Sequence, residues 1–281
     1  MKRFFALCLV IATSLGIVNN AAAYTKEKYG TTSTGVDLFW YSFTTALAGP
    51  RPAILVIHAG GFKAGNPGSL IAAQDLANAG YWTLAIEYRL APPAKPMQPR
   101  QSAANDNGLY PKQTADVQMA ILRARIDPRC NGLVAAVGGS AGGSHTVYCA
   151  GIGTKGGNKL DAGVSLSGAY DFHDPTSLFD PLRPSFAANV YNYVGSSNAT
   201  ILDNASPYKQ INASVAPLYI IASDNDPMPL HQFPDLINAL NSAGATNYQA
   251  LLRPNSSLHG FDYWPDVRDS VIAFFDRWLI R

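Results

Sequence analysis

The stretch "AAVGGSAGGSHTVY", residues 135–148, decides the fold, because it sets one serine among glycines. Small apolar residues run directly into Gly138-Gly139-Ser140-Ala141-Gly142-Gly143. Glycine weakens both helices and strands, so this cluster indicates a tight geometric requirement. The pattern Gly-x-Ser-x-Gly between a strand and a helix is typical of a sharp turn that presents the serine hydroxyl as a nucleophile. A glycine-rich surface loop is the alternative interpretation.

Strand and helix patterns alternate on both sides of this stretch. Apolar, β-branched runs predict strands at 51–61, 81–90, 132–139, 162–170, 216–223 and 248–254. Amphipathic patterns predict helices at 69–80, 114–126, 229–244 and 264–280. Strands that are apolar on both faces and separated by helices indicate an α/β fold, with a mostly parallel central sheet and helices on both faces. Residues 35–43 are expected to add an antiparallel hairpin at the edge of the sheet.

The predicted helix over 114–126 has one apolar stripe, formed by Ala115, Met119, Leu122 and Ile126. Residues three and four positions apart lie on the same face of a helix. This stripe is therefore expected to be the face that the helix buries.

The first 23 residues resemble a removable leader. Lys2 and Arg3 precede an apolar run, and Ala21-Ala22-Ala23 offers a small-residue cleavage site. We expect a signal peptide over 1–23 and a secreted or periplasmic mature chain, 24–281, folded as a single domain. The apolar run is short for a transmembrane helix, so no membrane anchor is expected, although an N-terminal anchor is the alternative.

Charge and composition narrow the range of partners. The chain has 21 Lys and Arg residues against 19 Asp and Glu residues, a net charge of +2. Lys2 and Arg3 of the expected leader account for this excess, so the mature chain would have no net charge. A balanced mature chain gives no reason to expect nucleic acid or an anionic membrane as a partner.

Two stretches interrupt the alternation of strands and helices, the proline-rich 91–111 and the polar 171–214. Long insertions are often functional loops or lids, so 171–214 is expected to form a small lid.

Cys130 and Cys149 flank the predicted strand and helix around Ser140. In an oxidising compartment two such cysteines can pair. A strand that rises and a helix that returns would bring them toward the same end of the sheet. A disulfide and a pair of buried thiols are the two alternatives.

A serine hydroxyl needs a base to take its proton as it attacks. In the strand–serine–helix architecture the chain order is Ser, then an acid, then His after the last strand. His259 follows the strand at 248–254 and precedes the final helix, which makes it the candidate base. Asp226, after the strand at 216–223, is the favoured acid for orienting the imidazole. Asp224 remains the alternative, with a turn or capping role as its other explanation.

Donors are also needed for the negative oxygen that develops during acyl transfer. The N–H of Ala141 begins the helix after Ser140, where the helix dipole favours negative charge. Gly60 and Gly61 follow the first buried strand, and glycine lets the backbone approach a substrate closely. These three N–H groups form the predicted oxyanion hole.

Five motifs together resemble one family: HAGGF (58–62), EYRLAPP (87–93), VGGSAGG (137–143), SDNDP (223–227) and HGF (259–261). Their order and spacing resemble the hormone-sensitive-lipase-like esterases of the α/β-hydrolase superfamily, over about residues 50–281. The resemblance implies the α/β-hydrolase fold and a small secreted serine carboxylesterase. It implies Ser140, Asp226 and His259 as the triad and Gly60, Gly61 and Ala141 as oxyanion donors. Ala59 replaces the first glycine of the usual motif, and Gly139 replaces the usual acid before the serine.

We therefore expect an exported ester hydrolase that forms an acyl-enzyme on small, sugar or aryl esters. Candidate pocket aromatics, for which simple packing is the alternative, are Tyr170, Phe172, Phe179, Tyr191 and Tyr193. No cofactor and no metal are expected, because no Cys/His cluster suggests one. A peptidase or acyltransferase, or a non-catalytic binding protein on the same fold, are the alternatives. The sequence does not fix the oligomeric state.

Overall fold

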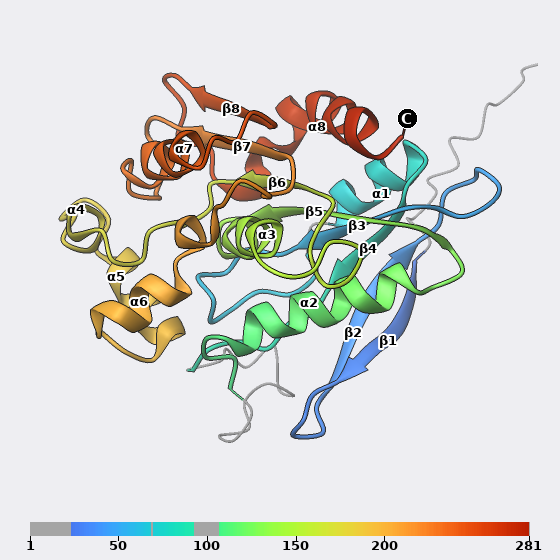
Figure 1. The fold of residues 1–281 in the computed structure, drawn as a ribbon, viewed down its shortest axis with the longest axis horizontal. Coiled ribbons are helices and arrows are strands. Elements are labelled where there is room, and N and C mark those ends of the chain that lie inside the picture. The colour runs from blue at the N-terminus through green and yellow to red at the C-terminus, as the bar shows by residue number, and fades with distance from the viewer. Residues whose placement is uncertain (1–23, 69, 93–106, 281) are drawn as a thin grey trace, which may run out of the picture.

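The computed structural model describes residues 24–68, 70–92 and 107–280 (Figure 1). The expected signal peptide, 1–23, lies outside the described residues, as does most of the proline-rich segment at 91–111. None of the helices in the described ranges is both long enough and apolar enough to span a membrane.

One sheet runs through the described chain, in the order β1-β2-β4-β3-β5-β6-β7-β8. Strands β3 to β8 pair in parallel, whereas β2 pairs antiparallel with β4 and with the edge strand β1. The mostly parallel sheet and its antiparallel edge hairpin are thus confirmed. The bounds are β1 Thr25–Thr31, β2 Asp37–Phe43, β3 Arg51–Ile57, β4 Trp82–Ile86, β5 Cys130–Gly139, β6 Ala162–Leu166, β7 Leu218–Ser223 and β8 Tyr248–Arg253.

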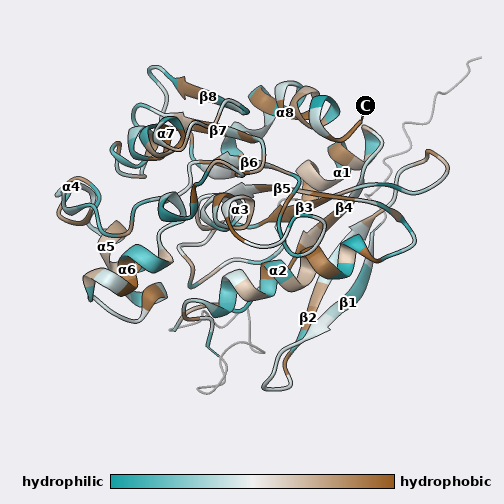
Figure 2. Ribbon diagram, in the orientation of Figure 1, coloured by the Kyte–Doolittle hydropathy of each residue, from teal (hydrophilic) through white to brown (hydrophobic). Residues whose placement is uncertain are grey.

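Helices cover both faces of the sheet. The helices that pack on the sheet are α1 Leu70–Asn78, α2 Lys112–Arg125, α3 Ala141–Gly151, α7 Gln232–Ser242 and α8 Trp264–Leu279. Alternate residues of β3 show which helices cover each face of the sheet, because successive side chains of a strand point to opposite faces. Ile54 and Val56 pack with α1 and α8, whereas Leu55 and Ile57 pack with α2 and α3. Figure 2 shows hydrophobic colour on β3 and β4 and a largely hydrophilic β1 at the edge.

The insertion at 171–214 folds into short helices beyond the end of β6. They are α4 Pro175–Leu178, α5 Ser185–Val194, α6 Ala199–Ala205 and the 3₁₀ helix η2 Pro207–Gln210. The apolar side chains of α4, α5 and α6 share one cluster with Phe62 and Ala141, the residues that follow the predicted oxyanion glycines and Ser140. Figure 1 shows α4, α5 and α6 grouped at one end of the molecule, away from α8.

The predicted buried stripe of α2 is wrong. Leu122 and Ile126 are 46% and 73% exposed, and Ala115 is exposed as well, while Met119 is half-buried. The apolar stripe that α2 buries is formed instead by Val117, Ala120, Ile121 and Ala124, and two polar residues near the start of the helix are buried with it. Asp116 is buried because it forms an ion pair of 2.7 Å with Arg89, next to β4. Gln113 is buried because its Nε2 donates to the main-chain oxygen of Phe62, at 2.7 Å.

The disulfide is not formed, and both Cys130 and Cys149 are buried free thiols. β5 begins at Cys130, two residues before the strand expected at 132–139. Its ten residues rise about 30 Å at ~3.3 Å each, whereas the helix from Ala141 to Cys149 returns only about 13 Å at ~1.5 Å per residue, so the two sulfurs do not meet. Cys130 Sγ instead donates to the main-chain oxygen of Leu133, at 3.4 Å. Burial raises the pKa of both thiols.

Candidate active site

Ser140 lies on a strained turn between β5 and α3. Its φ of +52° and ψ of −119° fall in a region that residues other than glycine rarely adopt. The turn is held by the Ser140 N–H, which donates to the main-chain oxygen of Leu166 on β6, at 2.7 Å. The stretch is buried from strand to helix, which rules out the surface-loop interpretation.

Close backbone contacts explain the glycines around Ser140. A Cβ built on Gly138 would lie 2.1 Å from the main-chain oxygen of Gly142. A Cβ on Gly142 would lie equally close to the oxygen of Ile57, the last residue of β3. Gly139 faces the Phe261 ring, which a Cβ would approach to 2.8 Å. An acidic side chain, usual at this position in the family that the sequence resembles, would meet that ring.

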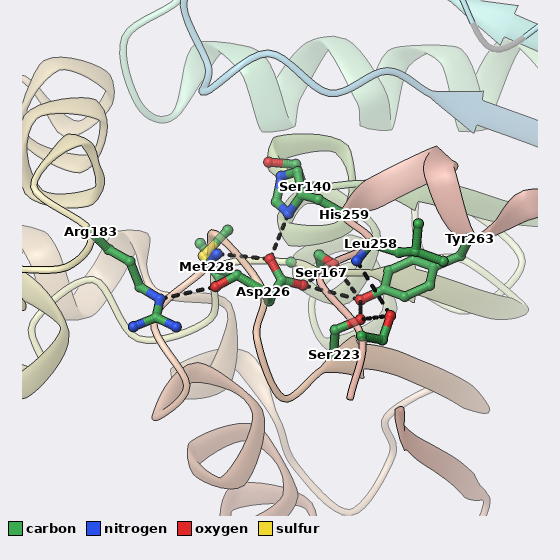
Figure 3. A network of polar contacts seen from close by, with 12 residues as sticks. Ser140, Ser167, Arg183, Ser223, Asp226, Met228, Leu258, His259 and Tyr263 are labelled. Atoms are coloured by element: carbon green, nitrogen blue, oxygen red, sulfur yellow. Dashed lines mark hydrogen bonds and ion pairs between the residues drawn. The ribbon is translucent and has the colours of Figure 1, made fainter. Parts of the chain in front are cut away.

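His259 and Asp226 come together at the same end of the sheet. His259 precedes the 3₁₀ helix η3, Gly260–Tyr263, and Asp226 follows β7. The two atoms His259 Nδ1 and Asp226 Oδ1 are 2.7 Å apart. The next residue touches the serine turn, because a Cβ on Gly260 would lie 3.7 Å from the Ser140 nitrogen. Figure 3 shows the imidazole directed toward both Ser140 and Asp226.

Asp226 is enclosed by donors and is only 2% exposed. Its Oδ1 also accepts from the N–H of Met228, at 2.7 Å. Its Oδ2 accepts a short hydrogen bond from the Ser167 hydroxyl and one of 3.1 Å from the Tyr263 hydroxyl. Burial alone would raise the pKa of Asp226. The hydrogen bond from His259, the charge of that ring, and the bonds from Ser167 and Met228 outweigh burial and lower this pKa.

Asp224, the alternative acid, has a different position. Its carboxylate accepts from the N–H groups of Asn255 and Ser256, at 2.8 and 3.1 Å. These bonds hold the loop between β8 and His259 in place and lower the pKa of Asp224. Asp224 therefore has the turn role that was its other explanation.

Three residues around Asp226 were not predicted from the sequence. Ser167 has a φ of +55° at the end of β6, and Tyr263 reaches Asp226 from η3. Burial raises the pKa of Tyr263 to about 12, so its hydroxyl stays protonated and can donate. Arg183, in the insertion, donates from Nε to the main-chain oxygen of Asp226, at 3.0 Å (Figure 3).

The predicted oxyanion residues lie on two adjoining segments. Gly60 and Gly61 have φ values of +138° and +56°, and the Gly60 oxygen accepts from the Ala64 N–H, at 3.0 Å. Ala141 is the first residue of α3 and packs against Phe62, which follows the two glycines. Within the described residues, no protein acceptor takes the N–H of Gly60, Gly61 or Ala141. These donors are therefore free for a substrate oxygen.

Two other histidines lie behind this loop, and both are buried and neutral. His145 Nε2 is 2.9 Å from Gln113 Oε1, and the His58 ring stacks on Tyr88 with centroids 4.2 Å apart. Burial, with a contribution from His58, lowers the pKa of His145 to about 3. Burial lowers the pKa of His58 to about 4. Neither ring contacts Asp226, so neither takes the place of His259 in the site.

Acid should destabilise the protein through these two histidines. An unfolded histidine titrates near pH 6.5, but His145 and His58 accept a proton only near pH 3 and 4. Between these pH values the unfolded chain binds more protons than the folded protein. The contribution of the two histidines to the free energy of unfolding is therefore fully present above about pH 6.5 and is lost as the pH is lowered. The drop in melting temperature from pH 8 to pH 5 should therefore be smaller for His145→Gln than for the wild type. Equal losses in the two proteins would contradict this assignment.

The candidate pocket aromatics are mostly packing residues. Tyr170, Phe172 and Tyr193 are each only 1% exposed. The Phe172 and Tyr193 rings surround Phe62, and Tyr193 stacks on it with centroids 4.3 Å apart. Phe179 is 76% exposed, and Tyr191 is half-buried.

One group of side chains outside this site has ligand atoms that could hold a metal ion. The ligand atoms of Asp174, His231 and Asp235 lie within 4.8 Å of one another. Asp174 already caps α4 by accepting from the N–H groups of Thr176 and Ser177. Burial and the charges of Asp174 and Asp171 raise the pKa of Asp235 to about 6.

No protein-family model and no curated protein matches the chain. A thermophilic esterase from the planctomycete Thermogutta terrifontis is similar in structure, with 19% identity, a TM-score of 0.70, and coverage of 92% of this chain and 94% of that one. The same bacterium's esterase 2 phosphonylated by sarin gives 18% identity, a TM-score of 0.75, and coverage of 92% and 96%.

The chain has the α/β-hydrolase fold. A propionate-bound structure of the Thermogutta esterase also matches, with 20% identity, a TM-score of 0.69, and coverage of 92% and 96%. At these identities the likeness shows a shared fold, and fold alone does not determine function. The fold expectation is confirmed.

Proposed function

We propose that the protein is an exported serine hydrolase of carboxylic esters, with Ser140 as nucleophile, His259 as base and Asp226 as acid. The observation that best supports this proposal is the 2.7 Å contact between His259 and a buried Asp226, beside a serine held at a strained strand-to-helix turn. A buried carboxylate with a lowered pKa holds one imidazole tautomer and stabilises its cation. Export is proposed from the leader pattern at 1–23.

The proposed reaction has two halves. His259 takes the Ser140 proton as the hydroxyl oxygen attacks the ester carbonyl. The carbonyl oxygen becomes negative and is held by the N–H groups of Gly60, Gly61 and Ala141. His259 then gives its proton to the leaving alcohol, and an acyl-enzyme remains. Water, deprotonated by His259, releases the acid and restores the serine.

Small acyl groups are the proposed substrates. The structures of the Thermogutta esterase include one bound to propionate and one bound to butyrate. Because Phe62, Ala141 and the insertion share one tightly packed cluster, we propose that the acyl side of this site is likewise small. The sequence also suggested sugar and aryl esters, and these stay part of the proposal as alternative alcohol groups.

An assay of the full chain tests the proposed function. Purified wild-type protein should hydrolyse p-nitrophenyl acetate and butyrate, and should leave the matching p-nitroanilides almost untouched. Faster cleavage of the anilides would favour the peptidase alternative. Transfer to an added alcohol in preference to water would favour an acyltransferase. No turnover of any of these substrates would favour a non-catalytic binding protein.

A further inference from the structure

Helix α5 is fixed directly over the proposed site by contacts at both of its ends. Before its first turn, Arg183 Nε donates to the Asp226 main-chain oxygen, at 3.0 Å. In its last turn, the Tyr193 ring stacks on Phe62, with centroids 4.3 Å apart and planes 10° apart. The helix is therefore tied both to the loop of the proposed acid and to the loop of the proposed oxyanion donors.

The middle of α5 places an amide side chain against one of those donors. A Cβ built on Gly61 would lie 2.8 Å from Asn189 Nδ2 and 3.0 Å from Asn189 Cγ. The amide thus occupies the space next to Gly61 that a side chain would fill. Gly61 has a φ of +56°, and its N–H is one of the free donors of the loop.

The Asn189 amide is not satisfied by the protein. Within the described part of the chain, its Oδ1 is buried and has no hydrogen-bond partner. One turn further along α5, the buried Nδ2 of Asn192 also has none. Folded proteins pair nearly all buried polar groups, and an unpaired one costs stability. An apolar residue of similar size would avoid that cost, so a role outside packing accounts better for an amide at position 189.

We propose that Asn189 is a further catalytic residue, a side-chain donor to the substrate carbonyl oxygen alongside Gly60, Gly61 and Ala141. This inference rests on the proposed function. Nδ2 donates a hydrogen bond and transfers no proton, so the bonds made and broken are those of the serine mechanism. The bond strengthens as the carbonyl oxygen gains negative charge, so it lowers the barrier more than it improves substrate binding.

Substitution to leucine tests this role, because leucine keeps the size of the side chain and removes the donor. In Asn189→Leu, kcat on p-nitrophenyl butyrate should fall about 10- to 100-fold with little change in KM, since three backbone donors remain. The melting temperature should stay the same or rise, because an unpaired buried oxygen is removed. Asn192→Leu is the matched control, and it should keep the wild-type kcat.

A second variant separates donation from shape. Asp has nearly the shape of Asn but brings negative charge toward the developing oxyanion. Asn189→Asp should therefore lose at least about tenfold more kcat than Asn189→Leu. If Asn189→Leu fails to fold, Asn189→Ala provides the same comparison with Asn189→Asp.

Three outcomes would overturn the inference, and they can be told apart. Wild-type kcat in a folded Asn189→Leu variant, with an active wild type, would overturn the donor role and leave the serine mechanism intact. A larger loss in Asn189→Leu than in Asn189→Asp would also overturn it, because that order indicates a role in shape. No ester hydrolysis by the wild type would overturn the proposed function and this inference together.

Discussion

Replacing Ser140 by alanine should reduce kcat on p-nitrophenyl butyrate by roughly 10⁴- to 10⁶-fold, because the variant lacks the hydroxyl that is proposed to form the acyl-enzyme. The fold should survive. Ser140 is held through its main-chain N–H, which donates to Leu166 and is kept in the variant. Alanine at a φ of +52° retains the strain that serine already bears. A melting temperature close to the wild-type value is therefore expected with the loss of activity.

Ser144→Ala is the matched control for this experiment. Ser144 is a buried serine of the same glycine-rich stretch, and its hydroxyl binds the main-chain oxygen of Ser140, at 3.3 Å. It also accepts from the N–H of Ala169, at 2.9 Å. Losing these bonds should cost stability, about 1 kcal/mol each, and leave kcat within about tenfold of wild type. Substantial turnover by Ser140→Ala would remove Ser140 from the mechanism.

Asp226→Asn should lower kcat by about 10³- to 10⁴-fold. An amide in place of the carboxylate cannot stabilise the imidazolium, and its NH₂ group can bind His259 in the wrong tautomer. The buried donors around it would also lose their charged acceptor, so we expect a lower melting temperature. Steady-state kinetics at pH 8, with circular dichroism to confirm folding, measure both effects.

Asp224→Asn provides the contrast that separates the two candidate acids. Asp224 accepts from Asn255 and Ser256 on the far side of its loop, and His259 contacts Asp226 instead. We expect Asp224→Asn to keep most of the wild-type kcat. A loss in Asp224→Asn as large as in Asp226→Asn would contradict the assignment of the acid.

The sheet and the candidate triad could be predicted because they depend on local patterns. Buried parallel strands are continuous apolar runs, and their ends are marked by glycine, proline and aspartate. The carboxyl ends of parallel strands meet at one edge of the sheet, so residues after separate strands converge there. This rule is why Ser140, Asp226 and His259 could be selected from sequence positions far apart.

The wrong and missing predictions have separate physical causes. In α2 the sheet buries the neighbouring apolar stripe, Val117, Ala120, Ile121 and Ala124, next to Asp116 and its ion pair with Arg89. The hydroxyls of Ser167 and Tyr263 reach Asp226 from β6 and η3, and nothing in their local sequence signals that contact. The two thiols stay free because β5 begins at Cys130, two residues before the strand expected at 132–139.

Asn189 could not be predicted from its local sequence. It lies in an insertion with no repeat or motif, and its distinguishing feature is a buried amide without a partner. Only the three-dimensional arrangement shows that this amide lies against Gly61. The functional contribution of the insertion therefore depends on packing that no local pattern encodes.

Labelling with a fluorophosphonate is the most direct test of the central claim, which is that His259 and Asp226 activate Ser140. The probe reacts with an activated serine and leaves unactivated serines alone. Folded wild-type protein should take up one probe, on the peptide that contains Ser140, while Ser140→Ala should take up none and Asp226→Asn should react far more slowly. A folded wild-type protein that stays unlabelled, or that carries the probe on another serine, would contradict the account.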